Sequence, residues 1–196
     1  DQVLRMTQVM IDGSKTTTQT DLTDRTYYAK GMFYYSKVSI NESSSTALNH
    51  TYVIETTLTK YNSIGQVLNM TQTTIDDGKT TLQVDEVDRV YDSLGRLTNS
   101  RVTVTETGLN LNHAYSQGIA ITKYNSLGQV LQMTQATIDQ GKTTVEIDSI
   151  DRTYDSIGRL LHSKQTVTET GTGLNHTYTQ ETTINKYNSL DQVLRM

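Results

Sequence analysis

The sequence predicts an all-β protein, a tandem array of antiparallel β-hairpins wound as a spiral, tube or solenoid. The first observation is a long sequence repeat. The same short segment begins at Tyr61, Tyr124 and Tyr187, at a constant spacing (124 − 61 = 63 and 187 − 124 = 63). The second is that β-branched residues and tyrosines recur in phase with glycine-containing turn signals, without a sustained helical stripe. These observations predict one continuous array over residues 1–196, in which about three such units contain two hairpins each.

The two ends of the chain share one phase. Residues 1–6 and 191–196 have the same sequence, Asp-Gln-Val-Leu-Arg-Met. The first Asp of each stands where Gly65 and Gly128 stand in the inner copies, which indicates a second, longer period (191 − 1 = 190). We therefore expect a window of a longer repetitive chain, or a subunit of an end-to-end polymer. Because the chain shows no initiator Met, signal-peptide pattern or membrane-spanning apolar run, we expect its targeting information to lie elsewhere.

Composition narrows the classes of function. Only 34% of the 196 residues are hydrophobic, so we expect a core that is thin for the length of the chain. The absence of cysteine excludes disulfides and thiolate metal sites. A net charge of −4, with charges interspersed, argues against nucleic acid as a partner because there is no basic stripe. Disorder is the alternative for so polar a chain, but the fixed phase of tyrosines and turn glycines favours order.

Each unit divides into two half-units that open on a tyrosine. The first runs from Tyr61 to Tyr91 (91 − 61 = 30) and the second from Tyr91 to Tyr124 (124 − 91 = 33). The tyrosine is followed by Asn or Asp, then Ser, an aliphatic residue and Gly, which is turn chemistry because Asx side chains bond backbone amides and Gly supplies positive φ. The structural repeat motif comprises Tyr61, Asn62, Gly65, Tyr91, Asp92, Gly95, Arg96, Tyr124, Asn125, Gly128, Tyr154, Asp155, Gly158, Arg159, Tyr187 and Asn188.

The first half-unit is predicted to be a hairpin with a tight turn. A stretch over 129–139 is rich in β-formers, and Asp-Gln-Gly-Lys at 139–142 is a hairpin signal. A second strand over 143–154 is predicted to return to the next tyrosine phrase. Matching hairpin signals stand at 12–15 and 76–79.

In the second half-unit the far turn is expected to be looser, around 107–110 and 170–173. Strands near a dozen residues would be roughly 40 Å long. Pairs such as Val130-Leu131 and Leu160-Leu161 place apolar groups on both faces. Such strands suit a sheet rolled into a tube or spiral better than a simple sandwich.

Two turns carry a family resemblance. Residues 91–98 (Tyr-Asp-Ser-Leu-Gly-Arg-Leu-Thr) and 154–160 (Tyr-Asp-Ser-Ile-Gly-Arg-Leu) resemble the YD repeat of RHS proteins. The match to Tyr-Asp-x-x-Gly-Arg-Leu is full in these two copies, degraded in the three copies with Asn, and nearly lost at 27–33. The resemblance implies large extracellular bacterial proteins, or the ectodomains of teneurins, with β-hairpins wound as a spiral sheet. Some of these sheets close into hollow shells that enclose a toxin.

Three features depart from that family. The half-units are longer than the commonest YD spacing, and the chain has neither a conserved core ending nor a toxin segment. Its long-range regularity also exceeds what a capped shell needs. A shell must close, whereas a sequence that returns to its own phase can continue. These departures favour a fibre over a container.

Two recurring clusters of residues are candidate sites. His50, His113 and His176 recur at the spacing of the unit (113 − 50 = 63 and 176 − 113 = 63), and stacked imidazoles could form a metal or pH-sensing ladder. No second ligand of matching phase is compelling, so a turn-proximal His retained by duplication is favoured. Acidic pairs that precede an arginine could bind calcium, but their spacing fits neither an EF-hand loop nor the Gly-Gly-x-Gly-x-Asp nonapeptide, and the arginine favours structural ion pairs. These pairs are Asp21/Asp24, Asp85/Asp88 and Asp148/Asp151, followed by Arg25, Arg89 and Arg152.

We therefore expect a non-enzymatic extracellular structural protein that forms or extends a β-rich filament, stalk or surface fibre. No catalytic, cofactor-binding or metal-binding residue is assigned, because the candidate groups repeat with the fold. The expected partner is the chain itself, through neighbouring repeats or identical subunits end to end, without nucleic acid or a membrane span. The expected location is secreted or on a bacterial cell surface. Two alternatives remain, an RHS-type shell that encloses a toxin or other cargo, and a cell-surface adhesin.

Overall fold

The computed structural model describes residues 2–45, 47–188 and 192–195. These residues form β-strands joined by turns and contain no helix, which confirms the all-β prediction. Fifteen of the strands belong to one large sheet, and every strand pair described below is antiparallel. The chain divides into two compact units, residues 1–88 with 102–114 and residues 89–101 with 115–196. The strands β9 (Leu97–Gly108) and β10 (Leu111–Tyr124) contribute residues to both units.

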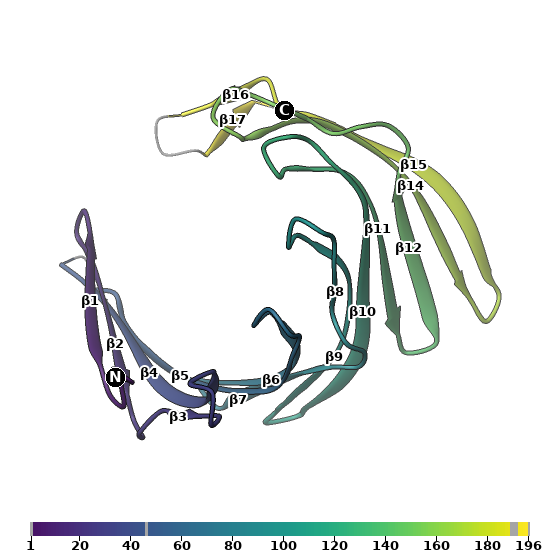
Figure 1. The fold of residues 1–196 in the computed structure, drawn as a ribbon. Coiled ribbons are helices and arrows are strands. Elements are labelled where there is room, and N and C mark those ends of the chain that lie inside the picture. The colour runs from purple at the N-terminus through teal and green to yellow at the C-terminus, as the bar shows by residue number, and fades with distance from the viewer. Residues whose placement is uncertain (1, 46, 189–191, 196) are drawn as a thin grey trace. The chain divides into compact units, whose positions relative to one another are not determined.

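The first unit is a meander in which each long strand pairs with the next (Figure 1). The long strands follow the order β1-β2-β4-β5-β6-β7, after which β7 pairs with the second half of β9, and the short β3 pairs with the start of β4. Its strands are β1 (Thr7–Asp12), β2 (Lys15–Asp21), β3 (Thr26–Tyr27), β4 (Phe33–Ser44), β5 (Asn49–Tyr61), β6 (Val67–Asp76) and β7 (Lys79–Asp85).

The second unit repeats this meander. The strand β11 pairs with β10 and β12, β12 pairs with β14, and β14 pairs with β15 (Figure 1). Short strands flank the tyrosine turns, since β13 pairs with the start of β14 and β16 pairs with β17. The bounds are β8 (Val90–Tyr91), β11 (Val130–Asp139), β12 (Lys142–Asp148), β13 (Thr153–Tyr154), β14 (Leu160–Gly171), β15 (Leu174–Thr183), β16 (Lys186–Tyr187) and β17 (Val193–Arg195).

The predicted tight hairpins are confirmed. Asp76 pairs with Lys79, and Asp139 pairs with Lys142, so each loop has only two residues. Both loop residues have positive φ, at 47° for Gln140 and 80° for Gly141, as a type I′ turn requires. This turn matches the right-handed twist of the flanking strands, which is why Gly follows a polar residue here.

The single strand predicted over 143–154 is wrong, because the chain leaves the ladder after Asp148. The strand β12 ends at that residue and the two-residue β13 begins at Thr153. The Asp148 carboxylate is buried, and its Oδ2 accepts the Met133 amide (2.9 Å) and the Arg152 Nε–H (2.9 Å). Because a buried charge must be paired, the loop folds back to bring the arginine to the aspartate.

The looser far turn expected around 107–110 and 170–173 is also wrong. Gly171 pairs with Leu174, so this hairpin closes with two loop residues. A Cβ at Gly171 would lie 3.1 Å from the carbonyl oxygen of Gly141, in the neighbouring tight turn. The glycine therefore permits a close approach of two backbones, and the two hairpin turns lie side by side at the same ends of their strands.

The apolar core is as thin as composition predicts. Among the described residues, the buried hydrophobic side chains are Val38 in β4, Val104 in β9 and Val167 in β14. Three buried aspartates, Asp21, Asp85 and Asp148, recur near the ends of β2, β7 and β12. Most of the sheet is half-exposed on each face, so the fold depends on ladder hydrogen bonds and cross-strand pairs rather than on a deep core.

Candidate functional site

The tyrosine turns are the most regular feature of the molecule, and the Asp copies show how they are built. In the turn after β8, Asp92 Oδ1 accepts the amides of Leu94 and Arg96, both at 2.9 Å. Its other oxygen accepts the Arg96 Nε–H at 2.7 Å. Gly95 has a φ of 80° and its amide donates to the Asp92 carbonyl at 3.0 Å. The Asx side chain thus closes the turn that the sequence predicted from Asp and Gly.

The Asn copies use a different closing pair. Asn125 Oδ1 accepts the amides of Leu127 and Gln129, both at 2.9 Å, as Asp92 does in its own turn. Its Nδ2–H donates to Gln129 Oε1 at 2.5 Å. Asn is therefore matched by Gln four residues later, just as Asp is matched by Arg. The matched pairs are Asn62/Gln66, Asn125/Gln129, Asn188/Gln192, Asp92/Arg96 and Asp155/Arg159.

The hydroxyls of four motif tyrosines, Tyr61, Tyr124, Tyr154 and Tyr187, tie their turns to an earlier strand. Tyr154 donates to the carbonyl of Val130 and Tyr187 to that of Leu160, both at 2.5 Å. Tyr124 makes the equivalent bond to the carbonyl of Leu97. Burial raises the pKa of the Tyr124 phenol, so it remains a donor. Each of these acceptor carbonyls lies at the start of a strand, so the tyrosines fix the spacing of successive turns.

The arginines of the two full YD motifs stack on the tyrosines that follow. The Arg159 guanidinium carbon lies 4.5 Å from the centroid of the Tyr187 ring, and Arg96 lies 4.5 Å from that of Tyr124. A planar guanidinium over an aromatic face is a favourable cation–π contact. The carboxylate of Asp155 holds the guanidinium in place, because it accepts from Arg159 Nε at 2.6 Å. Asp, Arg and Tyr thus act as one structural group.

The acidic pairs are divided between two kinds of contact. The first member is buried beside its arginine, as in the pair of Asp148 and Arg152. The second member pairs with a basic side chain that lies earlier in the chain, which is Lys123 for Asp151 (2.5 Å), Lys60 for Asp88 and Arg5 for Asp24 (2.6 Å). Both contacts are ion pairs between neighbouring strands or loops. Within the described residues, no group of His, Asp and Glu has an arrangement that could hold a metal ion.

The recurring histidines lie in a charged row that the sequence analysis missed. His176 Nδ1 lies 3.8 Å from Glu169 Oε2, and Lys142 lies 2.5 Å from Glu169 Oε1. The lysine holds the pKa of the Glu169 carboxyl below its usual range. The same three residue types meet in the other units as Lys15, Glu42 and His50, and as Lys79, Glu106 and His113. Each Glu is the partner of matching phase that sequence spacing alone did not identify.

The motif residues predicted from sequence are brought together only in part. The Asx, Gly and Arg of a turn meet within that turn. The tyrosines instead contact a turn or strand from an earlier half-unit, as Tyr124 does with Leu97 and Arg96. The glutamines that close the Asn turns were missed, although the signal was present, since Gln stands four residues after each such Asn. Predicted Asp191, the counterpart of Gly128, lies outside the described residues.

Comparison with known proteins does not place the chain in a family. No family model, curated protein or solved structure matches the chain. The described part of the chain also has no helix with the length and apolarity that a membrane crossing needs.

Proposed function

We propose that this chain is a non-enzymatic structural protein, secreted or held on a bacterial cell surface, that extends a β-rich filament, stalk or fibre. In this proposal the YD-like hairpins continue as a spiral from one copy to the next. The supporting observation is that β1 and β15, the outermost strands of the large sheet, each have one side unpaired within the described residues. Their sequences also occupy neighbouring positions in the repeat. Among the described strands, β1 pairs only with β2, and β15 only with β14.

The repeat defines how these two edges would meet. The sequence of β1, Thr-Gln-Val-Met-Ile-Asp, corresponds to Thr-Gln-Ala-Thr-Ile-Asp in β11. The sequence of β15 begins Leu-Asn-His-Thr-Tyr, where β10 has Leu-Asn-His-Ala-Tyr. Since β10 pairs with β11, β15 of one copy can pair with β1 of a second copy. The β10–β11 register, Gln117 with Thr137, becomes Gln180 with Met10 of the next copy.

The exposure of β1 supports an edge that is covered in the assembly. Val9, Met10 and Ile11 are consecutive apolar residues with exposed fractions of 57%, 60% and 74%. Positions of the same phase in β6 and β11 are Thr73, Thr74 and Ile75, or Ala136, Thr137 and Ile138, and most of them are half-buried. An exposed apolar edge strand with unpaired backbone groups is a template for another strand.

A disulfide trap tests this register directly, because the chain has no cysteine of its own. The Met10→Cys/Gln180→Cys variant tests the proposed joint, which is the pairing of β15 of one copy with β1 of the next. The two cysteines would lie directly opposite each other, with their Cα atoms about 5 Å apart and within disulfide range. The matched control is Val9→Cys/Gln180→Cys, since a shift of one residue turns the thiol to the other face of the sheet.

Oxidation should produce a ladder of covalent multimers in the first variant and little in the control. Electron microscopy of the cross-linked material should then show fibres of uniform width. A disulfide that forms within single chains would instead support a closed shell. Equal cross-linking of both variants, or of neither, would contradict the proposed joint.

A further inference from the structure

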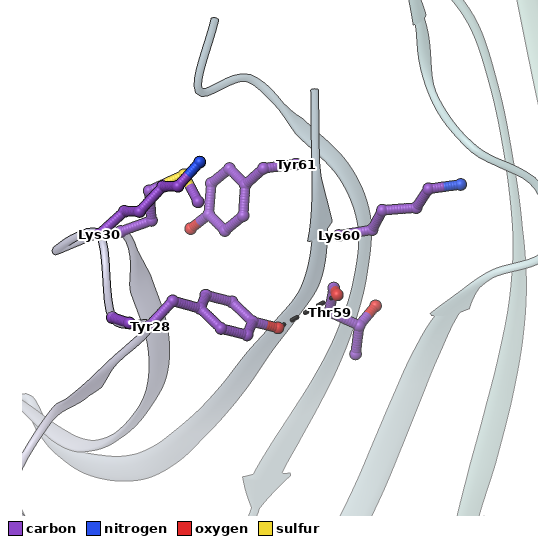
Figure 2. Close-up of a pocket in the computed structure, with 7 residues that line it drawn as sticks. Tyr28, Lys30, Thr59, Lys60 and Tyr61 are labelled. Atoms are coloured by element: carbon purple, nitrogen blue, oxygen red, sulfur yellow. Dashed lines mark hydrogen bonds between the residues drawn. The ribbon is translucent and has the colours of Figure 1, made fainter. Parts of the chain in front are cut away.

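The first unit contains a pocket where the regular repeat is interrupted. Its volume is about 380 Å³, near the lower end of ligand-binding pockets. Tyr28, Lys30 and Met32 contribute from the turn between β3 and β4, and Tyr61 contributes from the end of β5. Figure 2 shows the rings of Tyr28 and Tyr61 facing the same space, with the Lys30 side chain beside the Tyr61 ring.

The equivalent space beside the later tyrosines is filled by the protein itself. Tyr28 has the position of Asp92 in its turn, because its amide donates to the Met32 carbonyl as that of Asp92 does to Arg96. In the later turn, the guanidinium of Arg96 lies over the Tyr124 ring. The first unit has Tyr in place of Asp and Met in place of Arg. Among the described residues, no guanidinium therefore stacks on Tyr61. The substitutions therefore remove both the planar group and the carboxylate that holds it.

The polar atoms of the two tyrosines are already satisfied. The Tyr28 hydroxyl contacts the carbonyls of Leu58 and Thr59 at 3.0 and 3.1 Å. The Tyr61 hydroxyl donates to the carbonyl of Phe33. The ring centroids of Tyr28 and Tyr61 lie 6.1 Å apart, with planes at 90°. What these residues offer to a ligand is therefore a corner of two aromatic surfaces rather than hydrogen bonds.

The charge of the turn has also changed. The regular turn carries an Asp and an Arg that neutralise each other, as in the pair of Asp92 and Arg96. In the first unit the only charged residue at 28–32 is Lys30. Within the described residues its ammonium has no ion-pair or hydrogen-bond partner, whereas the nearby Lys60 is paired with Asp88. The rim of the pocket thus presents one uncompensated positive charge.

We propose that this pocket binds a planar aromatic ring that bears a carboxylate. The ring takes the place on Tyr61 that the guanidinium takes on Tyr124, with the Tyr28 ring and Met32 closing its sides. The carboxylate pairs with the Lys30 ammonium at the rim. This site goes beyond the structural role proposed above and does not depend on assembly of the chain.

The probe for the test is 2-naphthoate, with the uncharged 2-naphthamide as its isostere. Binding is followed by saturation-transfer NMR on the ligand during titration of the full chain. A ligand of this size that obeys ordinary ligand efficiency should bind with a Kd of roughly 1 mM. We expect saturable binding of naphthoate and binding of the amide at least fivefold weaker. Absence of saturable naphthoate binding would overturn the proposal, and equal affinities would refute the role of the carboxylate.

The chain supplies its own control variants. Tyr28→Asp/Met32→Arg copies the pair that closes the later turns, and we expect it to lower naphthoate affinity at least tenfold while circular dichroism shows an unchanged fold. Lys30→Leu copies Leu94, and it should bring naphthoate affinity down to that of the amide. Retention of full naphthoate affinity in the Tyr28→Asp/Met32→Arg variant would contradict this location for the site.

A transplant provides the reverse test. When added to the Tyr28→Asp/Met32→Arg variant, the substitutions Asp92→Tyr/Leu94→Lys/Arg96→Met should restore saturable naphthoate binding, now beside Tyr124. Restored binding would show that these three side chains and the following tyrosine are sufficient. Failure to restore it, with the fold intact by circular dichroism, would refute the claim that the repeat position determines the site.

Discussion

The guanidinium carbon of Arg96 lies 4.5 Å from the ring centroid of Tyr124, which opens the next tyrosine turn along the chain. The same arginine donates from Nε to Asp92 at 2.7 Å and from Nη1 to the carbonyl of Asn125 at 3.3 Å. One side chain therefore joins the closure of its own turn to the position of the following turn.

Replacing Arg96 with lysine should lower the free energy of unfolding by about 1 kcal/mol, because lysine can still approach Asp92 but lacks the planar group that stacks on Tyr124. Urea denaturation followed by circular dichroism measures the change. The matched control is Arg5→Lys, because Arg5 pairs with Asp24 where both side chains are 62% exposed. That pair should contribute little, so equal losses in both variants would contradict a specific role for stacking.

Substitutions at Gly128 should lower the stability of the fold by different amounts, according to how well the new residue tolerates a positive φ. Its φ is 79° and no atom lies within 4 Å of an added Cβ, so backbone strain alone decides the outcome. We expect Gly128→Val to cost about 2 kcal/mol and Gly128→Asp about half as much, because Asp tolerates the left-handed region better. Asp191 also has this phase in the sequence. Thermal unfolding of both variants is the measurement, and equal midpoints would refute the turn assignment.

Gly171 and Gly118 should respond in opposite directions to alanine. A Cβ at Gly171 would press on the Gly141 carbonyl at 3.1 Å, so Gly171→Ala should destabilise by about 1 kcal/mol. At Gly118 the nearest atom, Arg101 Cγ, lies at an ordinary 3.6 Å. Gly118→Ala should therefore stabilise by about 0.5 kcal/mol, since glycine weakens a strand interior. Differential scanning calorimetry of the two variants tests this contrast, and destabilisation of both would contradict it.

Acid should destabilise the Asp turns more than the Asn turns. The Arg96 amide, which donates to Asp92, holds the pKa of that carboxyl below its ordinary value, and the Arg159 amide does the same for Asp155. A depressed folded-state pKa contributes stability above the unfolded-state pKa of about 3.9, and that stability is lost as pH falls through the folded-state value. We therefore expect the urea midpoint to fall as the pH decreases from about 5 to 2.

The repeat itself provides the matched variant for this pH effect. Changing Asp92 and Asp155 to Asn, and Arg96 and Arg159 to Gln, copies the pair seen at Asn125 and Gln129. The urea midpoint of this variant should depend less on pH over the same range, because two titrating carboxylates are gone. An unchanged slope would mean that other carboxylates, such as Glu169 beside Lys142, dominate the acid response.

Local chemistry was predictable from the sequence, and contacts between distant residues were not. The turn at Asp92 could be predicted because the bonds of its side chain reach Leu94 and Arg96, which lie within the next four residues. The break after Asp148 could not, because it depends on the burial of the Asp148 carboxylate, which accepts the amide of Met133 in the preceding strand as well as the Arg152 Nε–H. The short loop after Gly171 likewise depends on the neighbouring turn at Gly141.

The same division applies to the candidate sites. The histidine period was visible in the sequence, but the pairing of His176 with Glu169 depends on the register between β14 and β15. The pocket beside Tyr61 was signalled by the poor match of residues 27–33 to the motif. That mismatch alone did not indicate a cavity, because the missing stack of Arg on Tyr is visible only by comparison with the later turns.

The meander has a consequence for synthesis. Among the paired residues of the described strands, the partners most distant along the chain are Lys15 in β2 and Ser44 in β4 (44 − 15 = 29), which still belong to adjacent hairpins. Contacts this local give a low contact order, and such chains fold quickly because little loop entropy is lost before each contact forms. A hairpin that leaves the ribosome finds its partners in the residues that have just preceded it. The array can therefore fold during translation, one half-unit at a time, without waiting for its C-terminal end.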